Sequence, residues 1–479
     1  GRYRLPAMGC GARGDSRVSA VIGLVDANNF YVSCERVFNP ALEGKPVGVM
    51  SNNDGCVIAR SAEMKAMEIA MGTPAYQLEG LRRRGVIHLL SSNYELYGDM
   101  SARLAQLLRD TCPEVAPYSI DEMFIYLDGL SDTQCQALGT ALRRRIRRYL
   151  GLPVCIGLAP THTLAKLANH LAKKQPHYAG VCLLHGESAT TQAVLKQLPV
   201  SDVWGVGRRL AERLAVSGIR TAWDLREHDP KRLRKRFSVV LARTALELRG
   251  TPCLELNAVE QPRQRIMTSR SFGKTTGVKE ELHAALRRHA QRSAEKLRLQ
   301  GSLARAVLLF LNTNRHRKDQ PQLSPSTMIP LEAPTNDTRA ILEAVREGLD
   351  QMYRPGFQFM KAGVMLLDLV DAQQYQLSLL QPTTKAHPHL MKAVDEINQK
   401  MGQGTLRFGM TDADAPWQLR CEHRSRRYTT CWDELMEAGT HPGAIAAARV
   451  KREQQRLAGG KRLAKARANG FTHYGNEHQ

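Results

Sequence analysis

The chain has 479 residues, a formal net charge of +22 and a hydrophobic fraction of 43%. At roughly 100–200 residues per domain this length predicts about three or four domains, and the hydrophobic fraction excludes a largely disordered chain. The longest apolar runs are of strand length, well short of the ~20 residues of a membrane-spanning helix, so no membrane span is expected.

Positive charge is distributed along the whole sequence. Residues 1–20 and 441–479 carry nine of the 22 excess positive charges, and the remainder lies between these two tails. Basic tails alone would be explained by solubility or disorder, whereas a basic core as well favours a polyanionic partner, because neutralised phosphates release counterions. Nucleic acid is the first candidate, and an anionic membrane surface is the second.

The ten cysteines are widely spaced, without a C-x-x-C pair or a histidine pair that would complete a zinc site. This spacing predicts a reducing compartment and no structural zinc. The first 20 residues lack the apolar core of a secretory signal, and we expect them to be a disordered extension.

Strand and helix signals alternate through the first 185 residues. An apolar run at 21–25 predicts a buried strand that ends in the carboxylate Asp26. Further strands are predicted at 46–50, 118–127 and 154–158, and helices at 61–70, 91–108, 133–150 and 161–174. The order strand, helix, acidic strand pair, helix, strand is typical of an α+β domain built on a split βαβ sheet with helices on one face.

Residues 186–258 look helical and basic, and a linker near Pro262 separates them from a second α+β unit. That unit is predicted to contain strands at 266–272, 303–312, 326–331 and 358–369 and helices at 278–299 and 335–352. Beyond Asp371 the pattern weakens, and residues 444–468 form either a basic helix or a disordered arm.

Three carboxylates are the first candidates for chemistry: Asp26 and the adjacent pair Asp121 and Glu122. The pair interrupts an apolar β segment, where charge is costly unless something compensates it. Two divalent metal ions would compensate it, because carboxylates suit Mg²⁺ and two ions can clamp an in-line phosphoryl displacement. The alternative is that Asp121 begins a tight turn and Glu122 is solvated.

The helix predicted at 161–174 has two distinct faces. Leucines and alanines form a buried stripe, and a second face carries Lys166, His170, Lys173 and Lys174. Such a basic face is usually solvated, but one of its lysines could reach the phosphates of a nucleotide, with Lys65 as a second cation.

Gly205 and Gly207 stand directly before Arg208 and Arg209 in the helical region. Glycines at this spacing let backbone N–H groups approach a phosphate at the start of a helix. A plain helix-connecting turn is the alternative, and the adjacent arginines favour a helix-hairpin-helix contact with the DNA backbone.

Near the end of the patterned region, Gln376, Leu377, Leu379 and Leu380 belong to a segment flanked by polar residues and proline. This segment is either a leucine-containing loop or a short peptide that docks into an apolar groove.

Six motifs stand out along the chain. They are D-A-N-N-F-Y at 26–31, S-N-N-D-G-C-V-I-A-R at 51–60, S-S-N-Y-E-L-Y at 91–97, Y-S-I-D-E at 118–122, T-L-A-K-L-A-N-H at 163–170 and S-R-R-Y-T-T at 425–430. Together they resemble the Y-family translesion DNA polymerases, and among these the UmuC-type catalytic subunit of bacterial DNA polymerase V. The resemblance covers most of the chain and leaves out both tails.

The resemblance implies a multidomain α+β polymerase shaped like a right hand. A ferredoxin-like palm would span 21–35 and 99–185, with small fingers at 36–98. A helix-hairpin-helix thumb would span 186–258, and a linker at 259–264 would lead to an α+β little finger at 265–372. Residues 373–440 would form a C-terminal region with a clamp-binding peptide, between the two tails at 1–20 and 441–479.

The resemblance also implies roles for individual residues. Asp26 and Asp121 would bridge two Mg²⁺ ions, Glu122 would hold the catalytic ion, and the carbonyl group of Ala27 would assist. Four residues would line the nucleotide site, namely Phe30, Tyr31, Lys65 and Lys173. Tyr31 would sense the sugar, and the two lysines would contact the triphosphate.

The implied activity is error-prone DNA synthesis past lesions in the SOS response of a bacterial cytoplasm, close to the nucleoid. The implied partners are primer-template DNA, deoxynucleoside triphosphates, a sliding clamp, a UmuD-type accessory dimer and a recombinase filament, with no membrane. A catalytically inactive recruitment subunit is one rival, and the retention of all three carboxylates disfavours it. A nucleotidyl cyclase is the other, and the basic charge and the hairpin motif disfavour it.

Overall fold

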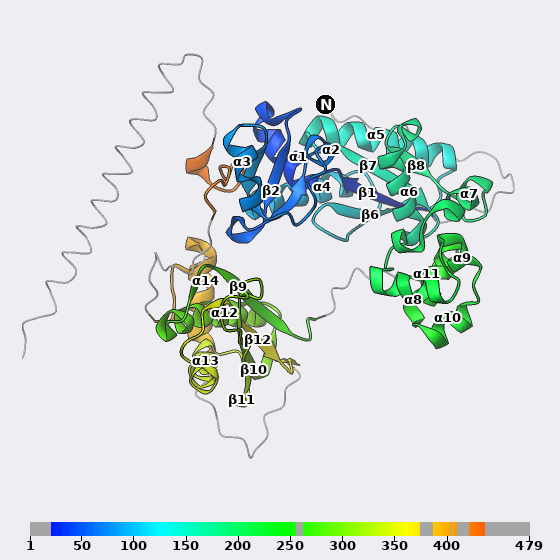
Figure 1. Cartoon of the computed structure of the whole chain (residues 1–479). Coiled ribbons are helices and arrows are strands. Elements are labelled where there is room, and N and C mark those ends of the chain that lie inside the picture. The colour runs from blue at the N-terminus through cyan, green and yellow to red at the C-terminus, as the bar shows by residue number, and fades with distance from the viewer. Residues whose placement is uncertain (1–20, 255–261, 374–386, 403, 410–420, 436–479) are drawn as a thin grey trace, which may run out of the picture. The chain divides into compact units, whose positions relative to one another are not determined.

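The computed structural model describes residues 21–254, 262–373, 387–402, 404–409 and 421–435 (Figure 1). Its contacts divide the chain into two units, residues 1–425 and 426–479. In the described part of the second unit, Trp432–Glu434 forms a 3₁₀ turn, and the guanidinium of Arg427 pairs with Glu434 at 2.7 Å. No helix among the described residues is long and apolar enough to cross a membrane.

A five-stranded sheet in the order β5-β6-β1-β7-β8 carries the three carboxylates. Its strands are β1 (Ile22–Ala27), β5 (Glu114–Pro117), β6 (Glu122–Tyr126), β7 (Val154–Ala159) and β8 (Val181–Leu183). Strand β1 is central and antiparallel to both β6 and β7. The order of the first four strands is that of a ferredoxin-like sheet, which confirms the predicted fold class.

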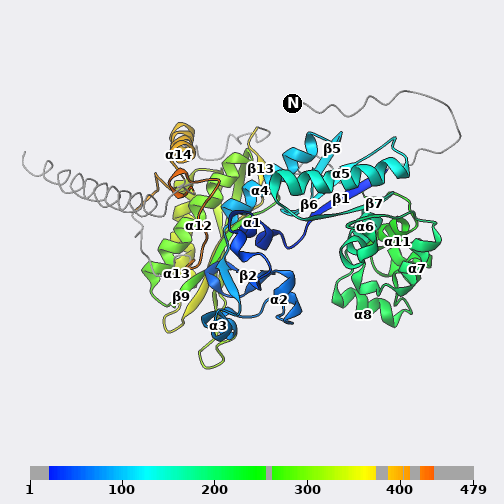
Figure 2. The ribbon, with the colours of Figure 1, turned by 90° about the horizontal axis from the view of Figure 1, so that it is seen from above.

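Helices cover both faces of this sheet. The two helices predicted between its strands, α4 (Tyr94–Arg109) and the helix that follows β6, contact each other, as expected for helices on one face, and a third helix covers the other face. Helix α5 (Asp132–Leu150) packs at Gly139 against Leu158, whereas α6 (His162–Lys174) packs on the neighbouring Gly157. Successive residues of a strand point to opposite faces, so the two helices lie on opposite sides of β7 (Figure 2). Both helices were predicted, but amphipathic periodicity does not say which face of a sheet a helix covers.

A three-stranded sheet in the order β3-β2-β4 follows β1 in the chain. It contains β2 (Val47–Met50), β3 (Val57–Arg60) and β4 (His88–Ser91), with helices α1 (Phe30–Phe38), α2 (Ala62–Ala66), α3 (Ala75–Arg83) and α4 (Tyr94–Arg109) around it. Sequence analysis predicted β2, α4 and a helix at 61–70, of which α2 is a shorter version. It missed β3 and β4, which have four residues each and show too little alternation to be recognised.

Residues 186–254 are helical, as predicted. They contain α7 (Ala189–Gln197), α8 (Arg208–Val216), α9 (Ala222–Glu227), α10 (Pro230–Arg236) and α11 (Val239–Leu248). Their apolar side chains form one core with α6 and β1. The fully buried carboxylate of Glu247 in α11 accepts hydrogen bonds from the backbone N–H and the hydroxyl of Thr163, at 2.9 and 2.8 Å, and so fixes α11 to the first turn of α6.

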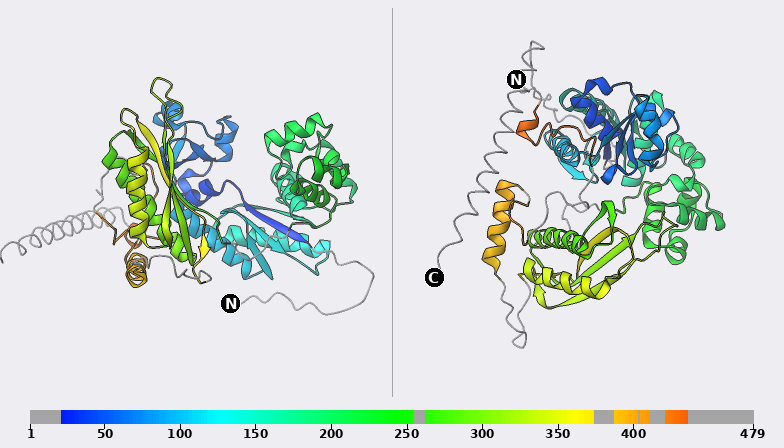
Figure 3. Two further views of the ribbon diagram at one scale, coloured as in Figure 1. Left: turned by 90° about the horizontal axis from the view of Figure 1, so that it is seen from below. Right: turned by 60° about the vertical axis from the view of Figure 1, so that its left-hand side comes forward.

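The second α+β unit has an antiparallel sheet in the order β11-β10-β12-β9. It comprises β9 (Ile266–Thr276), α12 (Lys279–Leu299), β10 (Ser302–Thr313), β11 (Ser326–Thr335), α13 (Thr338–Met352) and β12 (Phe359–Leu367). All six elements were predicted within a few residues. Both helices lie along one face of the sheet and share its core (Figure 3). One later helix, α14 (Pro388–Met401), was not predicted.

Close packing of α6 on the sheet depends on the missing side chain at Gly157. A Cβ atom at this position would collide with backbone atoms of Ala165 and Asn169 in α6, which cannot move aside as a flexible side chain could. The side-chain amide of Asn169 also donates to the carbonyl oxygens of Leu24 and Cys155, at 3.2 and 2.8 Å, so helix and strands are held in register.

The substitution Gly157→Ala is therefore expected to destabilise the protein by about 1–3 kcal/mol through overpacking. The control is Gly80→Ala in the exposed middle of α3, where no atom lies within 4 Å of the added methyl group. That control should be neutral or stabilising by up to about 1 kcal/mol, because alanine favours helix. Urea unfolding of both variants tests the difference, and equal unfolding midpoints would contradict it.

Candidate active site

The three carboxylates lie at the same end of the five-stranded sheet. Asp26 at the end of β1 lies directly opposite Glu122 of β6, and its side chain is 11% exposed. The backbone N–H of Ala27 donates to the carbonyl oxygen of Asp121 at 2.9 Å, which holds the neighbouring carboxylate beside the first. The hydroxyl of Ser119 donates to Asp121 at 2.6 Å and fixes the orientation of its side chain.

Two lysines of α6 compensate the negative charge. The Nζ atom of Lys173 lies 2.5 Å from Asp26, and that of Lys166 lies 3.0 Å from each carboxylate oxygen of Glu122. Burial raises the pKa of Asp26 to about 6 although Lys173 lowers it, and the charges of Glu122 and Asp121 raise this pKa further. Burial is thus the main reason why the charged form of Asp26 is disfavoured, and the ammonium group of Lys173 opposes this effect.

A cavity of about 260 Å³ opens over these groups and is lined by Asp26, Glu122, Lys166, Lys173 and Trp204. Lys166 also lies over aromatic rings, 4.3 Å from the ring centre of Tyr118 and 5.1 Å from that of Trp204. Sequence analysis did not assign Tyr118 or Trp204 to the site, and it named Lys166 only as one member of a basic helix face. Tyr118 stands in the Y-S-I-D-E motif, and Trp204 directly precedes Gly205.

Tyr31 lies on α1 and is surrounded by aromatic rings. It stacks on Tyr97 at 4.4 Å with an angle of 15° between the ring planes, and it meets Tyr94 edge-on at 6.0 Å. Phe30 is 4% exposed and belongs to the core. Tyr94 and Tyr97 were not predicted as site residues, although both lie in the S-S-N-Y-E-L-Y motif.

Lys65, on α2, donates from Nζ to the side-chain oxygen of Asn29 at 2.6 Å. Asn29 adopts a left-handed conformation, with φ of 48°, directly before α1. The amine of Lys65 is thus held next to the motif that contains Asp26 and Tyr31.

The proposed DNA-contacting glycines lie before α8. Gly205 has φ of 85°, in the left-handed region that favours glycine, and Gly207 directly precedes the helix. Arg208 and Arg209 follow in its first turn, and Arg208 forms an exposed pair with Glu212. Gln376, Leu377, Leu379 and Leu380 lie outside the described residues.

The oxygen donors at this site fit magnesium. Three carboxylates and the carbonyl group of Ala27 are hard ligands of the kind that Mg²⁺ takes, and a divalent cation would favour the charged form of the buried Asp26 carboxylate. Among the described residues, no three His, Cys, Asp or Glu side chains converge closely enough to hold an ion as they stand. Asp26 and Glu122 contact lysines instead.

Family models match most of the chain. The model of the impB/mucB/samB family matches residues 25–170, and the model of its C-terminal domain matches residues 263–379. The IMS family HHH motif matches residues 188–219, and a domain of unknown function matches residues 388–438.

Two curated relatives of Salmonella typhimurium, Protein ImpB and Protein UmuC, are each 42% identical over 422 residues, which is 87% of this chain and 99% of the relative. The chain belongs to the UmuC-type Y-family polymerases. DNA polymerase IV of Moorella thermoacetica is a more distant relative, 29% identical over 80% of this chain and 94% of its own length. The solved structure of a Dbh–Dpo4 Y-family polymerase chimera shares the fold, with a TM-score of 0.55, 18% identity and coverage of 73% of this chain and 99% of that one.

Membership of this family makes the chain a DNA-directed DNA polymerase that acts in translesion synthesis and SOS mutagenesis. A UmuC-type polymerase binds DNA and nucleotides and depends on divalent metal ions. The predicted family, fold class and activity are thereby confirmed.

In this UmuC-type site, Lys166→Met should strengthen binding of a divalent ion several-fold, because no ammonium group then competes for the oxygens of Glu122. Binding is read directly by titrating Mn²⁺ and following its electron paramagnetic resonance signal. The control is Lys174→Met on the exposed end of α6. Mn²⁺ affinity that is unchanged or weaker in Lys166→Met would contradict the expectation.

Proposed function

We propose that synthesis proceeds by two-metal nucleotidyl transfer at Asp26, Asp121 and Glu122. The observation that carries this proposal is the pairing of Asp26 with Glu122 across two strands, with Asp121 held beside them. Two Mg²⁺ ions bound there would activate the primer 3′-hydroxyl and stabilise the charge on the leaving pyrophosphate. Asp26, Asp121 and Glu122 would hold the ions, and the carbonyl of Ala27 would supply a further oxygen ligand.

We propose domain assignments on the same basis. Residues 21–35 and 99–185 form the palm, 36–98 the fingers, 186–258 the thumb and 265–372 the little finger, after a linker at 259–264. The five-stranded sheet, the three-stranded sheet, the helical region and the four-stranded sheet support these four assignments in turn. Residues 373–440 form a C-terminal region, and the remaining residues are tails.

Lys173 and Lys65 are proposed to bind the triphosphate of the incoming nucleotide. Lys173 contacts Asp26 now and can turn to a phosphate oxygen without leaving the site, because it lies at the end of α6 on a long flexible side chain. Gly205, Gly207, Arg208 and Arg209 are proposed to hold the DNA backbone through N–H groups and charge.

Asp26→Asn or Asp121→Asn is expected to abolish nucleotide incorporation, because each loses a negatively charged metal ligand. DNA binding should remain close to that of the wild type, because the basic surface is unchanged. The measurements are primer extension with Mg²⁺ and an electrophoretic mobility shift, with Asp128→Asn at an exposed position as the control. Near-normal extension by either variant would reject the assignment, and an inactive wild-type chain that still binds DNA would favour the recruitment subunit.

Tyr31 is proposed as the steric gate that excludes ribonucleotides. It stands two residues after Asn29, the residue that binds Lys65, in the motif that begins with Asp26, and its ring stacks on that of Tyr97. A ring packed under the sugar leaves no room for a 2′-hydroxyl, so discrimination comes from a clash.

Tyr31→Ala should therefore admit ribonucleotides while the protein stays folded. Phe30→Ala should mainly reduce stability, by about 3–5 kcal/mol for a buried phenylalanine. The measurement is the relative incorporation of matched ribo- and deoxyribonucleotides by the wild type and both variants. It distinguishes a residue that excludes ribonucleotides from one that only packs in the core. Rejection of ribonucleotides by Tyr31→Ala at the wild-type level would place the gate elsewhere.

We further propose that Gln376, Leu377, Leu379 and Leu380 form a sliding-clamp peptide. Leu379 and Leu380 would enter an apolar pocket on the clamp, each contributing on the order of 1–2 kcal/mol through burial. Replacing both with alanine should reduce clamp-stimulated synthesis and leave distributive synthesis on a short primer intact. If immobilised clamp captured this variant as well as the wild type, the assignment of a clamp-binding peptide would be refuted.

A UmuD-type accessory dimer and a recombinase filament are proposed as further partners, in a bacterial cytoplasm and near the nucleoid. These proposals rest on the similarity to UmuC-type relatives over most of the chain. The positive net charge is consistent with work close to DNA.

A further inference from the structure

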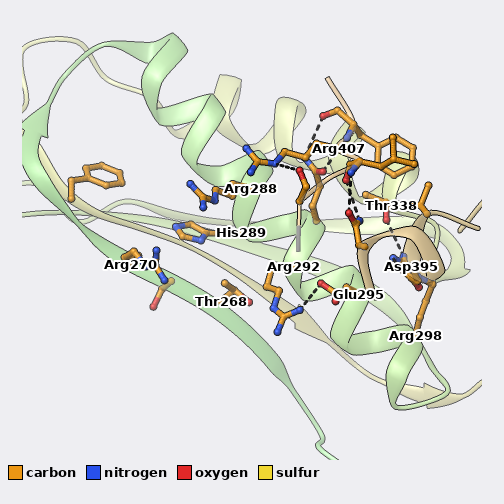
Figure 4. A pocket seen from close by; sticks show the side chains of 18 residues that line it. Thr268, Arg270, Arg288, His289, Arg292, Glu295, Arg298, Thr338, Asp395 and Arg407 are labelled. Atoms are coloured by element: carbon orange, nitrogen blue, oxygen red, sulfur yellow. Dashed lines mark hydrogen bonds and ion pairs between the residues drawn. The ribbon is translucent and has the colours of Figure 1, made fainter. Parts of the chain in front are cut away.

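The C-terminal segment that matches a domain of unknown function is attached to the protein at two places. The first is α14, which contacts the end of α12 through Arg298 and the start of α13 through Thr338. Asp395 of α14 receives two hydrogen bonds of 2.7 Å from the guanidinium of Arg298, beside a cavity of about 250 Å³ (Figure 4). Met391, on the same helix, is 2% exposed.

The second attachment is at the end of β4. Residues 422–425 run parallel to this strand, where the backbone N–H of Ser91 donates to the carbonyl oxygen of His423 at 3.1 Å. The backbone N–H of His423 donates to the hydroxyl of Ser91 at 2.9 Å, and that of Glu422 donates to the side chain of Asp54 at 2.9 Å. The segment thus extends the edge of the three-stranded sheet.

At Ser425 the segment reaches a buried polar chain. The side-chain amide of Asn93 donates to the hydroxyl of Ser425 at 2.9 Å, and this hydroxyl donates to Glu35 at 3.0 Å. The same oxygen of Glu35 accepts a hydrogen bond of 2.7 Å from the hydroxyl of Tyr97. Glu35 is 1% exposed, so these two hydroxyl groups replace the water that an exposed carboxylate would have.

The polar chain ends at the tyrosine proposed as the sugar gate. Tyr97, held by Glu35, stacks directly on Tyr31. Glu35 stands four residues after Tyr31 in α1, on the same face of the helix. Burial raises the pKa of Glu35, and the hydrogen bonds from Tyr97 and Ser425 oppose that rise, so both donors favour the charged carboxylate that holds the chain together.

We propose that residues 422–425 complete the sugar-selecting wall of the nucleotide site, with Ser425 as a positioning residue. Ser425 donates a hydrogen bond to Glu35, and Glu35 accepts one from Tyr97. Tyr97 in turn stacks on Tyr31 and fixes its ring in the position that excludes a 2′-hydroxyl. This inference rests on the proposed role of Tyr31. It gives part of the domain of unknown function a specific task in substrate selection.

The test is steady-state incorporation of matched ribo- and deoxyribonucleotides by the full chain. Ser425→Ala should lower the discrimination between the two sugars by roughly three- to tenfold, because a small displacement of a positioning group is amplified in the rate. Ser425→Thr keeps a hydroxyl and should restore most of the discrimination. The control Thr405→Ala removes a hydroxyl from the same C-terminal region, where its hydrogen bonds are local, and should change nothing.

The ratio of the two incorporation efficiencies separates positioning from a general loss of structure. A damaged fold lowers both efficiencies together, whereas a displaced gate raises ribonucleotide use relative to deoxynucleotide use. In a Tyr31→Ala background, Ser425→Ala should have no further effect on the ratio, because the two residues act through one wall.

Two results would overturn the inference, and they are distinguishable. Collapse of discrimination in Tyr31→Ala with wild-type discrimination in Ser425→Ala would show that the gate works without the C-terminal segment. Wild-type discrimination in Tyr31→Ala itself would remove the gate and with it the role of Ser425.

Discussion

Three carboxylates on one end of a sheet repel one another, and positive charge has to be brought to them. Helix α6 does this by presenting Lys173 to Asp26 and Lys166 to Glu122 from one face. Gly157 allows the helix backbone to come close enough, and Glu247 fixes its first turn to α11. The packing of the helical region on α6 therefore serves the electrostatics of the sheet, and the lysines occupy positions from which phosphates and cations can displace them.

The proposed sugar gate has a separate structural support. Tyr31 lies on α1, which follows β1 directly, so the gate and the first carboxylate are separated by a short, well-ordered segment. The ring of Tyr31 is held by stacking on Tyr97 of α4, and Tyr97 is held by its hydrogen bond to the buried carboxylate of Glu35. Because Ser425 also binds Glu35, a segment far from the sheet in sequence contributes to the support of the proposed gate. On these proposals, catalysis and sugar selection depend on different buried polar groups, and variants can separate them.

Much of this architecture was predictable because its signals are local. The apolar run before Asp26, the stripe on α6 and the six elements of the second α+β unit all follow from periodicity within one element. The pairings could not be predicted in this way. Lys166 and Glu122 are 44 residues apart, and Ser425 and Glu35 are 390 residues apart, so nothing in either local pattern indicates the other. The placement of α6 on the opposite face from α5 depends on Gly157, whose effect appears only when the helix is packed against it.

The central claim is that the lysines of α6 stand where divalent ions and a triphosphate bind during synthesis. The most direct measurement is a crystal structure of the chain with primer-template DNA, an unreactive deoxynucleoside triphosphate and Mn²⁺, with the metal located by anomalous scattering. The account predicts Mn²⁺ bound to oxygens of Asp26, Asp121 and Glu122, with the amine of Lys173 moved from Asp26 to a phosphate oxygen. An occupied nucleotide site with Lys173 still paired to Asp26 and no anomalous peak at the carboxylates would contradict it.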